Sequence, residues 1–357
     1  MINFEELTEK YKYVRMVRPE DNQDLHNFLE SISMECGPLD IQYSRKPDIF
    51  ASFNEQSDRY YIFVYLNNDF SIGGFGSLII KKMYINEEFV EAGYYADMRL
   101  SPKLGRKGHI QSRQIYAESL KRYKEIEEIK NVKYFYTAIL KNNEKALNAL
   151  TKNKRGIHYH KITEYRVQSL LKINYRKPND KFNVSYNKNF NYLESYLKKI
   201  SFQENPSQQN TITIERDGKV LMSAVLKKMK YRNLIITRAS LSLMTLGRLL
   251  PLLKRPSIKV KKEFVQRYIT DIVFYDSKFS KDELMNELLS FIRLSNDYST
   301  THAYSFIVQK SDDLTKSLSR CFTEETIGIL FQVTSDLEDK TISANDSTLI
   351  GFDICTS

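Results

Sequence analysis

Residues 94–118, YYADMRLSPKLGRKGHIQSRQIYAE, decide the fold. The aromatic and apolar residues of Tyr94–Leu100 predict a strand, and Pro102 ends it because proline has no backbone N–H to donate. Gly105 and Gly108 give the next loop conformational freedom, and the residues after them have a helical apolar pattern. The first N–H groups of a helix are unpaired and lie at the positive end of its dipole. The stretch therefore predicts a strand, an anion-binding loop and a helix, with phosphate as the expected anion.

Three cations lie on this loop: Lys103, Arg106 and Lys107. Their clustering favours a diphosphate, because each cation can form charge-assisted hydrogen bonds with phosphate oxygens. The alternative is a connection that needed glycine only for its turn.

The same residues resemble motif A of the GNAT superfamily of N-acetyltransferases, whose loop amides hold the pyrophosphate of acetyl-CoA. The chain departs from the motif at Gly105, where the family has Arg or Gln, and at Ile110, where it has a small residue. On this resemblance, Gly108→Glu is expected to abolish CoA binding and leave the fold nearly intact. The cofactor-binding residues that the resemblance implies are Met98, Arg99, Leu100, Lys103, Gly105, Arg106, Lys107, Gly108, His109 and Ile110.

A second resemblance follows at the expected distance. Val132–Leu140 predicts a buried strand, and Asn143 is placed to cap a short helix that ends at Leu150. Strand and capped helix in this order resemble the family's motif B, where splayed strands admit the pantetheine arm. The resemblance implies that Asn143 contributes to the cofactor site.

Acetyl transfer to an amine needs a base for the ammonium and an acid for the leaving thiolate. Asp97, just before the loop, and Glu91, at the entry of the same strand, are the candidate bases. The other reading of Asp97 is a salt bridge with Arg99 or Arg113.

The candidate acid is a tyrosine. The family often uses one on the motif B helix, but Leu150 occupies that position here. Tyr136 is the predicted substitute, with Tyr159 and Tyr165 as alternatives, and each of the three is equally suited to a core.

The composition limits the classes of protein to which the chain can belong. The chain has 357 residues, a net charge of +10 and three widely spaced cysteines, Cys36, Cys321 and Cys355. The cysteines argue against a disulfide framework or a zinc site, and the N-terminus has no signal-peptide pattern, so we expect a cytoplasmic protein without a membrane span. The basic clusters could contact nucleic acid, but a Lys- and Asn-rich composition explains them as well.

The rest of the chain predicts two α/β (α+β) GNAT-like domains, each a mixed, mostly antiparallel central sheet flanked by helices. Residues 1–173 form the acyl-CoA-binding domain, residues 174–209 a linker with a helix at 190–200, and residues 210–357 a second domain without the glycine loop. The first domain is expected to contain strands at 12–20, 59–67 and 72–85 and helices at 21–34 and 43–53. Residues 157–172 fit one long strand or two strands broken by Glu164. The second is expected to contain a 211–215/219–228 hairpin, strands at 232–242, 268–276, 301–309 and 326–334, helices at 243–254, 281–294 and 312–322, and an edge strand at 351–357.

The sequence thus predicts an N-acetyltransferase that uses acetyl-CoA and an unidentified amine, small molecule or protein, by direct attack. Two alternatives stay open on the same fold: a non-catalytic CoA-binding sensor, and a transferase of longer acyl or aminoacyl groups. Nucleic acid and membrane are not expected as partners, and a homodimer is left open. His158 and His160 share one strand face, but no further ligands at metal-binding spacing accompany them, so no metal is predicted.

Overall fold

The computed structural model describes residues 1–32, 34–36, 39–151, 156–174, 177–187, 200–201, 203–204, 211–253, 256–308, 314, 318, 321–335, 342 and 349–350. Helices within these ranges are α1 (Phe4–Glu9), α2 (Asn22–Ser31), α3 (Ile49–Asn54), α4 (Arg106–Lys121), α5 (Glu144–Leu150), α7 (Leu241–Leu249) and α8 (Lys281–Leu294). The strands of the first half are β1 (Val14–Met16), β2 (Met34–Cys36), β3 (Leu39–Ser44), β4 (Tyr60–Leu66), β5 (Ile72–Ile85), β6 (Glu88–Leu100), β7 (Tyr134–Leu140) and β8 (His158–Ile173). Those that follow are β9 (Asn183–Asn187), β10 (Ile200–Ser201), β11 (Gln203–Glu204), β12 (Thr211–Arg216), β13 (Lys219–Lys227), β14 (Asn233–Ala239), β15 (Glu263–Phe264), β16 (Gln266–Phe274), β17 (Ala303–Val308), β18 (Cys321–Thr334) and β19 (Leu349–Ile350).

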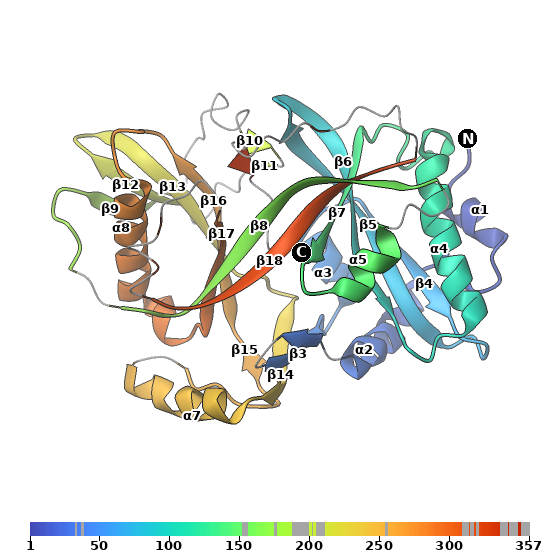
Figure 1. Ribbon diagram of the computed structural model, residues 1–357, viewed down its shortest axis with the longest axis horizontal. Coiled ribbons are helices and arrows are strands. Elements are labelled where there is room, and N and C mark those ends of the chain that lie inside the picture. Colours follow the sequence, from blue (N-terminus) through green and yellow to red (C-terminus); the bar gives the residue numbers. More distant parts are fainter. Residues whose placement is uncertain are drawn as a thin grey trace.

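A sheet of 13 strands runs through both halves of the molecule, in the order β1-β4-β5-β6-β7-β18-β8-β17-β16-β13-β12-β9, with β11 beside β5. Most neighbours are antiparallel, and the parallel pairs within it are β6 with β7 and β16 with β17. The long strands β8 and β18 cross the middle of the view in Figure 1 and connect the two halves. The predicted fold class, a mixed, mostly antiparallel sheet flanked by helices, is confirmed.

Helices cover both faces of the first half of the sheet. One face packs on α1 and α4, through residues such as Leu7, Ile115 and Leu120, and the other packs on α2 and α3. The predicted inward residues of α2, Leu25 and Phe28 among them, are buried. Both faces of β5 are therefore buried, and its residues are buried without a break from Gly73 to Lys81.

The second half repeats part of this design. Its parallel pair β16 and β17 is joined through α8, as β6 and β7 are joined through α4. Leu284, Leu288 and Ile292 on α8 pack against β12 and β13 in a separate core. This repetition is consistent with a tandem arrangement.

The predicted helix at 43–53 is wrong at its start. Residues 39–44 form β3, which pairs antiparallel with β14, and α3 begins only at Ile49, where Asp48 accepts a hydrogen bond from the Phe50 N–H at 2.8 Å. Pairing with a strand almost 200 residues away overrides the local helical pattern. Likewise, the predicted strand at 232–242 ends at Ala239 and belongs to a separate sheet, β15-β14-β3-β2.

The sequence did not predict α1, or that β18 lies between β7 and β8. The predicted β8 is one unbroken strand, and the hairpin at 211–228 and the helix at 281–294 are confirmed. Most of the predicted helices at 190–200 and 312–322, and the predicted edge strand at 351–357, lie outside the described residues. Where those two helices were predicted to end, Ile200 begins β10 and Cys321 begins β18.

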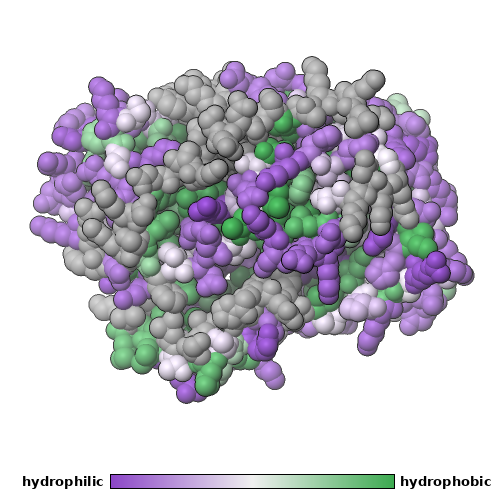
Figure 2. Space-filling view, viewed as in Figure 1, coloured by the Kyte–Doolittle hydropathy of each residue, from purple (hydrophilic) through white to green (hydrophobic). Residues whose placement is uncertain are grey.

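Polar side chains cover most of the described surface in Figure 2, while apolar side chains gather over α7 and the turn after it. Leu241, Leu249 and Leu252 are the exposed leucines of that segment. None of the helices in the described part of the chain has the length and apolarity that a membrane crossing requires.

Candidate functional site

The site is built on a fork between β6 and β7. The two strands pair in parallel over Ala92–Tyr134, Gly93–Phe135 and Tyr94–Tyr136, and the pairing ends there. Beyond it, β7 continues beside β18, whereas β6 stays with β5 through a bulge. Asp97 lies in this bulge with a φ of 54°, and the Thr137 hydroxyl donates to the Tyr95 carbonyl across the opening at 2.9 Å. The backbone of β6 after Tyr94 therefore has no strand partner on its β7 side.

A narrow cavity of about 40 Å³ opens at this fork on the α4 side. It is lined by Phe63, Tyr65, Gly76, Ser77, Tyr95, Ala96, Met98, Ile115, Tyr116, Ser119, Thr137 and Leu150. The predicted Met98 is thus at the cavity, and Leu150 lines it from α5. Motifs A and B, which the sequence placed far apart, meet here.

Tyr95 and Tyr116 are two of the residues that line this cavity. The Tyr95 hydroxyl bonds to Ser119 Oγ at 2.9 Å, and the Tyr95 and Tyr116 rings are 4.4 Å apart in an edge contact. Burial raises the pKa of Tyr116 well above its usual value, and burial raises the pKa of Tyr159, its hydrogen-bond partner, to about 12. These phenols stay protonated at neutral pH, and sequence analysis missed Tyr116 because it appeared only as part of a helical face.

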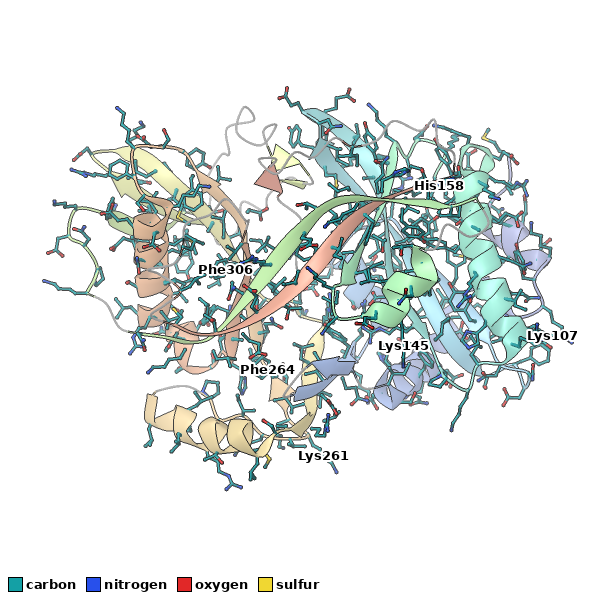
Figure 3. The ribbon with its side chains drawn as sticks, viewed as in Figure 1. Lys107, Lys145, His158, Lys261, Phe264 and Phe306 are labelled. Carbon is teal, nitrogen blue, oxygen red and sulfur yellow. The ribbon has the colours of Figure 1, made fainter. Side chains whose placement is uncertain are left out.

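The basic loop lies at the start of α4. Gly105 is the N-cap residue, and the side chains of Lys103, Arg106 and Lys107 are exposed. None of the described residues forms an ion pair with these cations. Lys107 projects from the first turn of α4 at the edge of the molecule in Figure 3. Free N–H groups and unpaired cations together suit an anionic ligand.

Gly108 has a packing role in addition to the predicted one. It is buried, and a Cβ there would lie 2.7 Å from a Leu104 methyl and 3.0 Å from the Leu66 carbonyl. The glycine thus permits close packing of α4 on β4. The expectation that Gly108→Glu leaves the fold nearly intact is wrong, because the new side chain has no room.

The other predicted cofactor residues lie around the loop and the fork. Ile110 is exposed and His109 half-buried on the first turn of α4, while Leu100 packs into the core beneath α4. Asn143 accepts a hydrogen bond from the Ala146 N–H at 3.1 Å and thus caps α5, as predicted. Arg99 lies on the opposite face of β6 from the cavity, in the cluster described next.

Asp97 and three arginines form a buried charge cluster on that opposite face. Arg45, Arg99 and Arg232, called the arginine cluster below, come from the segment after β3, from β6 and from the segment before β14. Arg45 Nη2 donates to Asp97 Oδ2 at 2.6 Å, and Arg99 Nη2 lies 3.7 Å from Asp97 Oδ1. Burial raises the pKa of the Asp97 carboxyl, but the arginine cluster outweighs it and holds that pKa below its ordinary value. Asp97 therefore forms the predicted ion pair with Arg99, and Arg45 is an addition that no sequence signal indicated.

The two remaining catalytic candidates lie apart from each other. Tyr136 is fully buried and stacks on Tyr94 at 4.9 Å, at the point where the fork opens. Glu91 lies three residues before Tyr94, where its carboxylate pairs with Arg59 at 2.5 Å. The structure brings Tyr136 close to the fork, and it leaves Glu91 on the fully paired part of β6.

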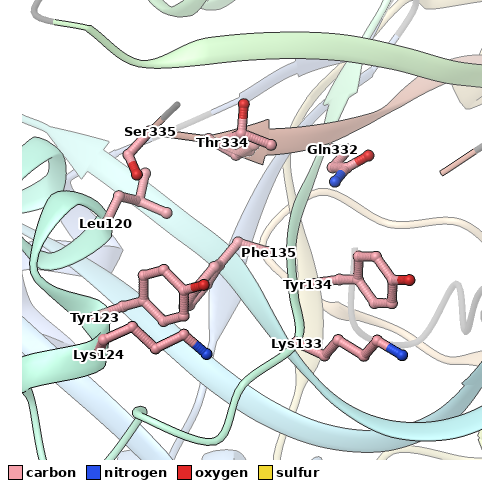
Figure 4. A pocket seen from close by; sticks show the side chains of 10 residues that line it. Leu120, Tyr123, Lys124, Lys133, Tyr134, Phe135, Gln332, Thr334 and Ser335 are labelled. Carbon is pink, nitrogen blue, oxygen red and sulfur yellow. The ribbon is translucent and has the colours of Figure 1, made fainter. Parts of the chain in front are cut away.

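A second cavity, of about 190 Å³, lies at the other end of α4 (Figure 4). Tyr123, Lys124, Lys133 and Thr334 are among its lining residues. It opens next to the C-terminal end of α4, where unpaired carbonyls disfavour an anion. It is larger than the cavity at the fork.

Comparison with known proteins identifies the fold. No family model and no curated protein matches the sequence. Among solved structures, the GCN5-related glucosamine N-acetyltransferase region of a fungal multi-domain GH3 β-N-acetylglucosaminidase matches with a TM-score of 0.54 and 10% identity, covering 89% of this chain and 38% of that chain. Saccharomyces cerevisiae N-myristoyltransferase with bound myristoyl-CoA matches with a TM-score of 0.53 and 9% identity over 98% of this chain and 93% of that chain. The chain has the GNAT fold, as the sequence resemblance predicted.

Asp97→Asn is expected to lower the free energy of unfolding by roughly 3–5 kcal/mol, because it leaves buried guanidiniums without their counter-charge. Since the folded-state pKa of Asp97 is lowered, the wild-type advantage is present at neutral pH and is lost as the pH falls through that pKa. Urea unfolding at several pH values measures both effects. Asp217→Asn, at a carboxylate that is 90% exposed, is the control. An equal decrease of the free energy of unfolding in the two variants would show that the Asp97 ion pairs do not stabilise the fold.

Proposed function

We propose that the protein is an acyl-CoA-dependent N-acyltransferase that moves an acetyl group to an amine. The observation that carries this proposal is the fork between β6 and β7 with a cavity behind it and a basic helix N-terminus beside it. The solved structures that share the fold are N-acyltransferases by title, which supports acyl transfer in general. The expected cytoplasmic location and the division into residues 1–173, 174–209 and 210–357 stay part of the proposal.

The loop would hold the CoA diphosphate. The N–H groups of Arg106, Lys107 and Gly108 belong to the first turn of α4, and the side chains of Lys103, Arg106 and Lys107 can pair with phosphate oxygens. The pantetheine arm would then run to the fork, where β6 has backbone groups without a strand partner.

The size of the fork cavity favours a short acyl group. Its volume of about 40 Å³ is a few times the roughly 10–15 Å³ that one buried water molecule needs. The Tyr95 and Tyr116 rings line this cavity, and in this proposal they limit the length of the acyl chain. The solved yeast enzyme is described with bound myristoyl-CoA, so the same fold serves long donors elsewhere.

In the reaction, the amine nitrogen bonds to the thioester carbonyl carbon, the carbon–sulfur bond breaks, the amine loses a proton and the sulfur gains one. Tyr116 stays protonated at the cavity, so we assign it as the group that can donate to the leaving sulfur. Asp97 stays a predicted base, although its ion pairs lower its basicity; we assign it chiefly to hold Arg45 and Arg99.

A CoA-binding sensor is the second candidate. Leu150 favours it, because the leucine lines the cavity at the position where the family often has its tyrosine acid. Release of free thiol from acetyl-CoA in the presence of an amine panel separates the two: binding without release on any amine supports the sensor.

Arg106→Glu with Lys107→Glu is expected to weaken acetyl-CoA binding by at least tenfold, because both cations at the start of α4 become anions facing the diphosphate. Isothermal titration calorimetry measures the dissociation constant. The matched control is Lys121→Glu with Lys124→Glu, at the other end of the same helix. If the control loses binding and the first variant keeps it, CoA binds at the larger cavity, and the proposed site is wrong.

Tyr116→Ala is expected to shift the donor preference from acetyl-CoA toward acyl chains of about four to eight carbons, since it removes a ring that lines the cavity. Tyr116→Phe keeps that ring and removes the hydroxyl, so it should preserve the preference and lower kcat. Thiol-release assays across an acyl-CoA series give both quantities. A wild type that already prefers long chains would refute the assignment of a short donor.

A further inference from the structure

The arginine cluster is a buried excess of positive charge. Its three guanidiniums and the Asp97 carboxylate sum to a charge of +2. The side chains are almost inaccessible: Arg45 is 1% exposed and Arg232 9%. Burial lowers the pKa of Arg45 to about 10, and repulsion from Arg232 and Arg99 adds to that effect. Burying unbalanced charge is costly, so an additional anion at this place would stabilise the protein.

One nitrogen of the cluster is available to such an anion. Arg99 Nη1 is buried and has no hydrogen-bond partner, while Arg99 Nη2 is 3.7 Å from Asp97. The guanidinium of Arg99 is held over the Tyr43 ring at 4.8 Å, and that of Arg232 lies over the same ring at 4.6 Å. Arg45 is fixed by Ser52 Oγ at 2.9 Å and by the Phe53 ring. The arginines are therefore already positioned, which lowers the entropy cost of binding an oxyanion.

The cluster lies directly behind the donor cavity. Tyr95 and Met98 line the cavity on one face of β6, while Asp97 and Arg99 belong to the cluster on the other. In this segment β6 no longer pairs with β7. A molecule held by Arg99 could thus present its amine to a thioester through the open fork.

We propose that the arginine cluster binds an oxyanion of the amine acceptor, so that the acceptor class is an amine carrying a carboxylate, as in an amino acid, or a phosphate, as in an amino-sugar phosphate. This rests on the proposed acyl transfer. A guanidinium group pairs with a carboxylate and with a phosphate in the same way. The assay therefore includes one pair of acceptors for each of the two oxyanions.

The first measurement follows the release of free thiol from acetyl-CoA and gives the KM of matched acceptors. Amino acids are compared with their carboxamides, and amino-sugar phosphates are compared with the free amino sugars. The charged member of one pair should have a KM roughly 10- to 100-fold lower than its neutral partner, since hydrogen bonds to a charged group are worth about 1.5–3 kcal/mol. Arg99→Gln should remove that difference without changing the dissociation constant of acetyl-CoA, and Arg99→Lys should restore part of it. Arg238→Gln, an exposed arginine on β14, is the control. Equal KM values within both pairs would overturn the proposal.

A second measurement does not depend on turnover. Thermal unfolding is followed with increasing sodium phosphate or sodium acetate, at constant ionic strength set by sodium chloride. At least one oxyanion should raise the melting temperature of the wild type and of Arg238→Gln but not of Arg99→Gln or Arg232→Gln. Absence of any such difference overturns the anion site. If acetyl-CoA fails to bind while the oxyanion stabilises the wild type through Arg99, the acyltransferase proposal fails and the anion site stands.

Discussion

The divergence of β6 from β7 is the constraint on which the rest of the structure depends. The strands share three residue pairs and then separate, because β6 bulges against β5 at Asp97 while β7 follows β18. Thr137 spans the opening through its hydroxyl, so the gap does not close by further strand pairing. The cavity on one face, the charge cluster on the other and the basic loop at the end of β6 all take their positions from this separation.

The two halves of the chain contribute to the same site. β18 of the second half supports β7, and β3 pairs with β14, which follows Arg232 closely. Tyr43 on β3 stacks with arginines from both halves. The second half of the chain therefore helps to position the arginine cluster, since it supplies Arg232 and the strand that pairs with β3. The buried charges explain why the cluster needs such support: an ion cluster of this kind is stable only when its members are held rigidly.

The sequence predicted the local elements around the fork well, because strand, loop and capped helix each have a short-range signal. Residues 94–118 and Asn143 gave the fork, the basic loop and the cap of α5. Contacts between distant segments gave no such signal. Arg45 lies 52 residues before Asp97 along the chain, and the placement of β18 depends on sheet topology rather than on its own residues. The tight packing around Gly108 gave no signal for the same reason, because the Leu66 carbonyl beside it belongs to β4.

A crystal structure with bound CoA tests the central claim most directly. The diphosphate should lie within hydrogen-bonding distance of the backbone N–H groups of residues 106–108, with the sulfur at the fork between Met98 and Thr137. A CoA molecule in the larger cavity beside Lys124, or one whose sulfur points away from the fork, would contradict the account.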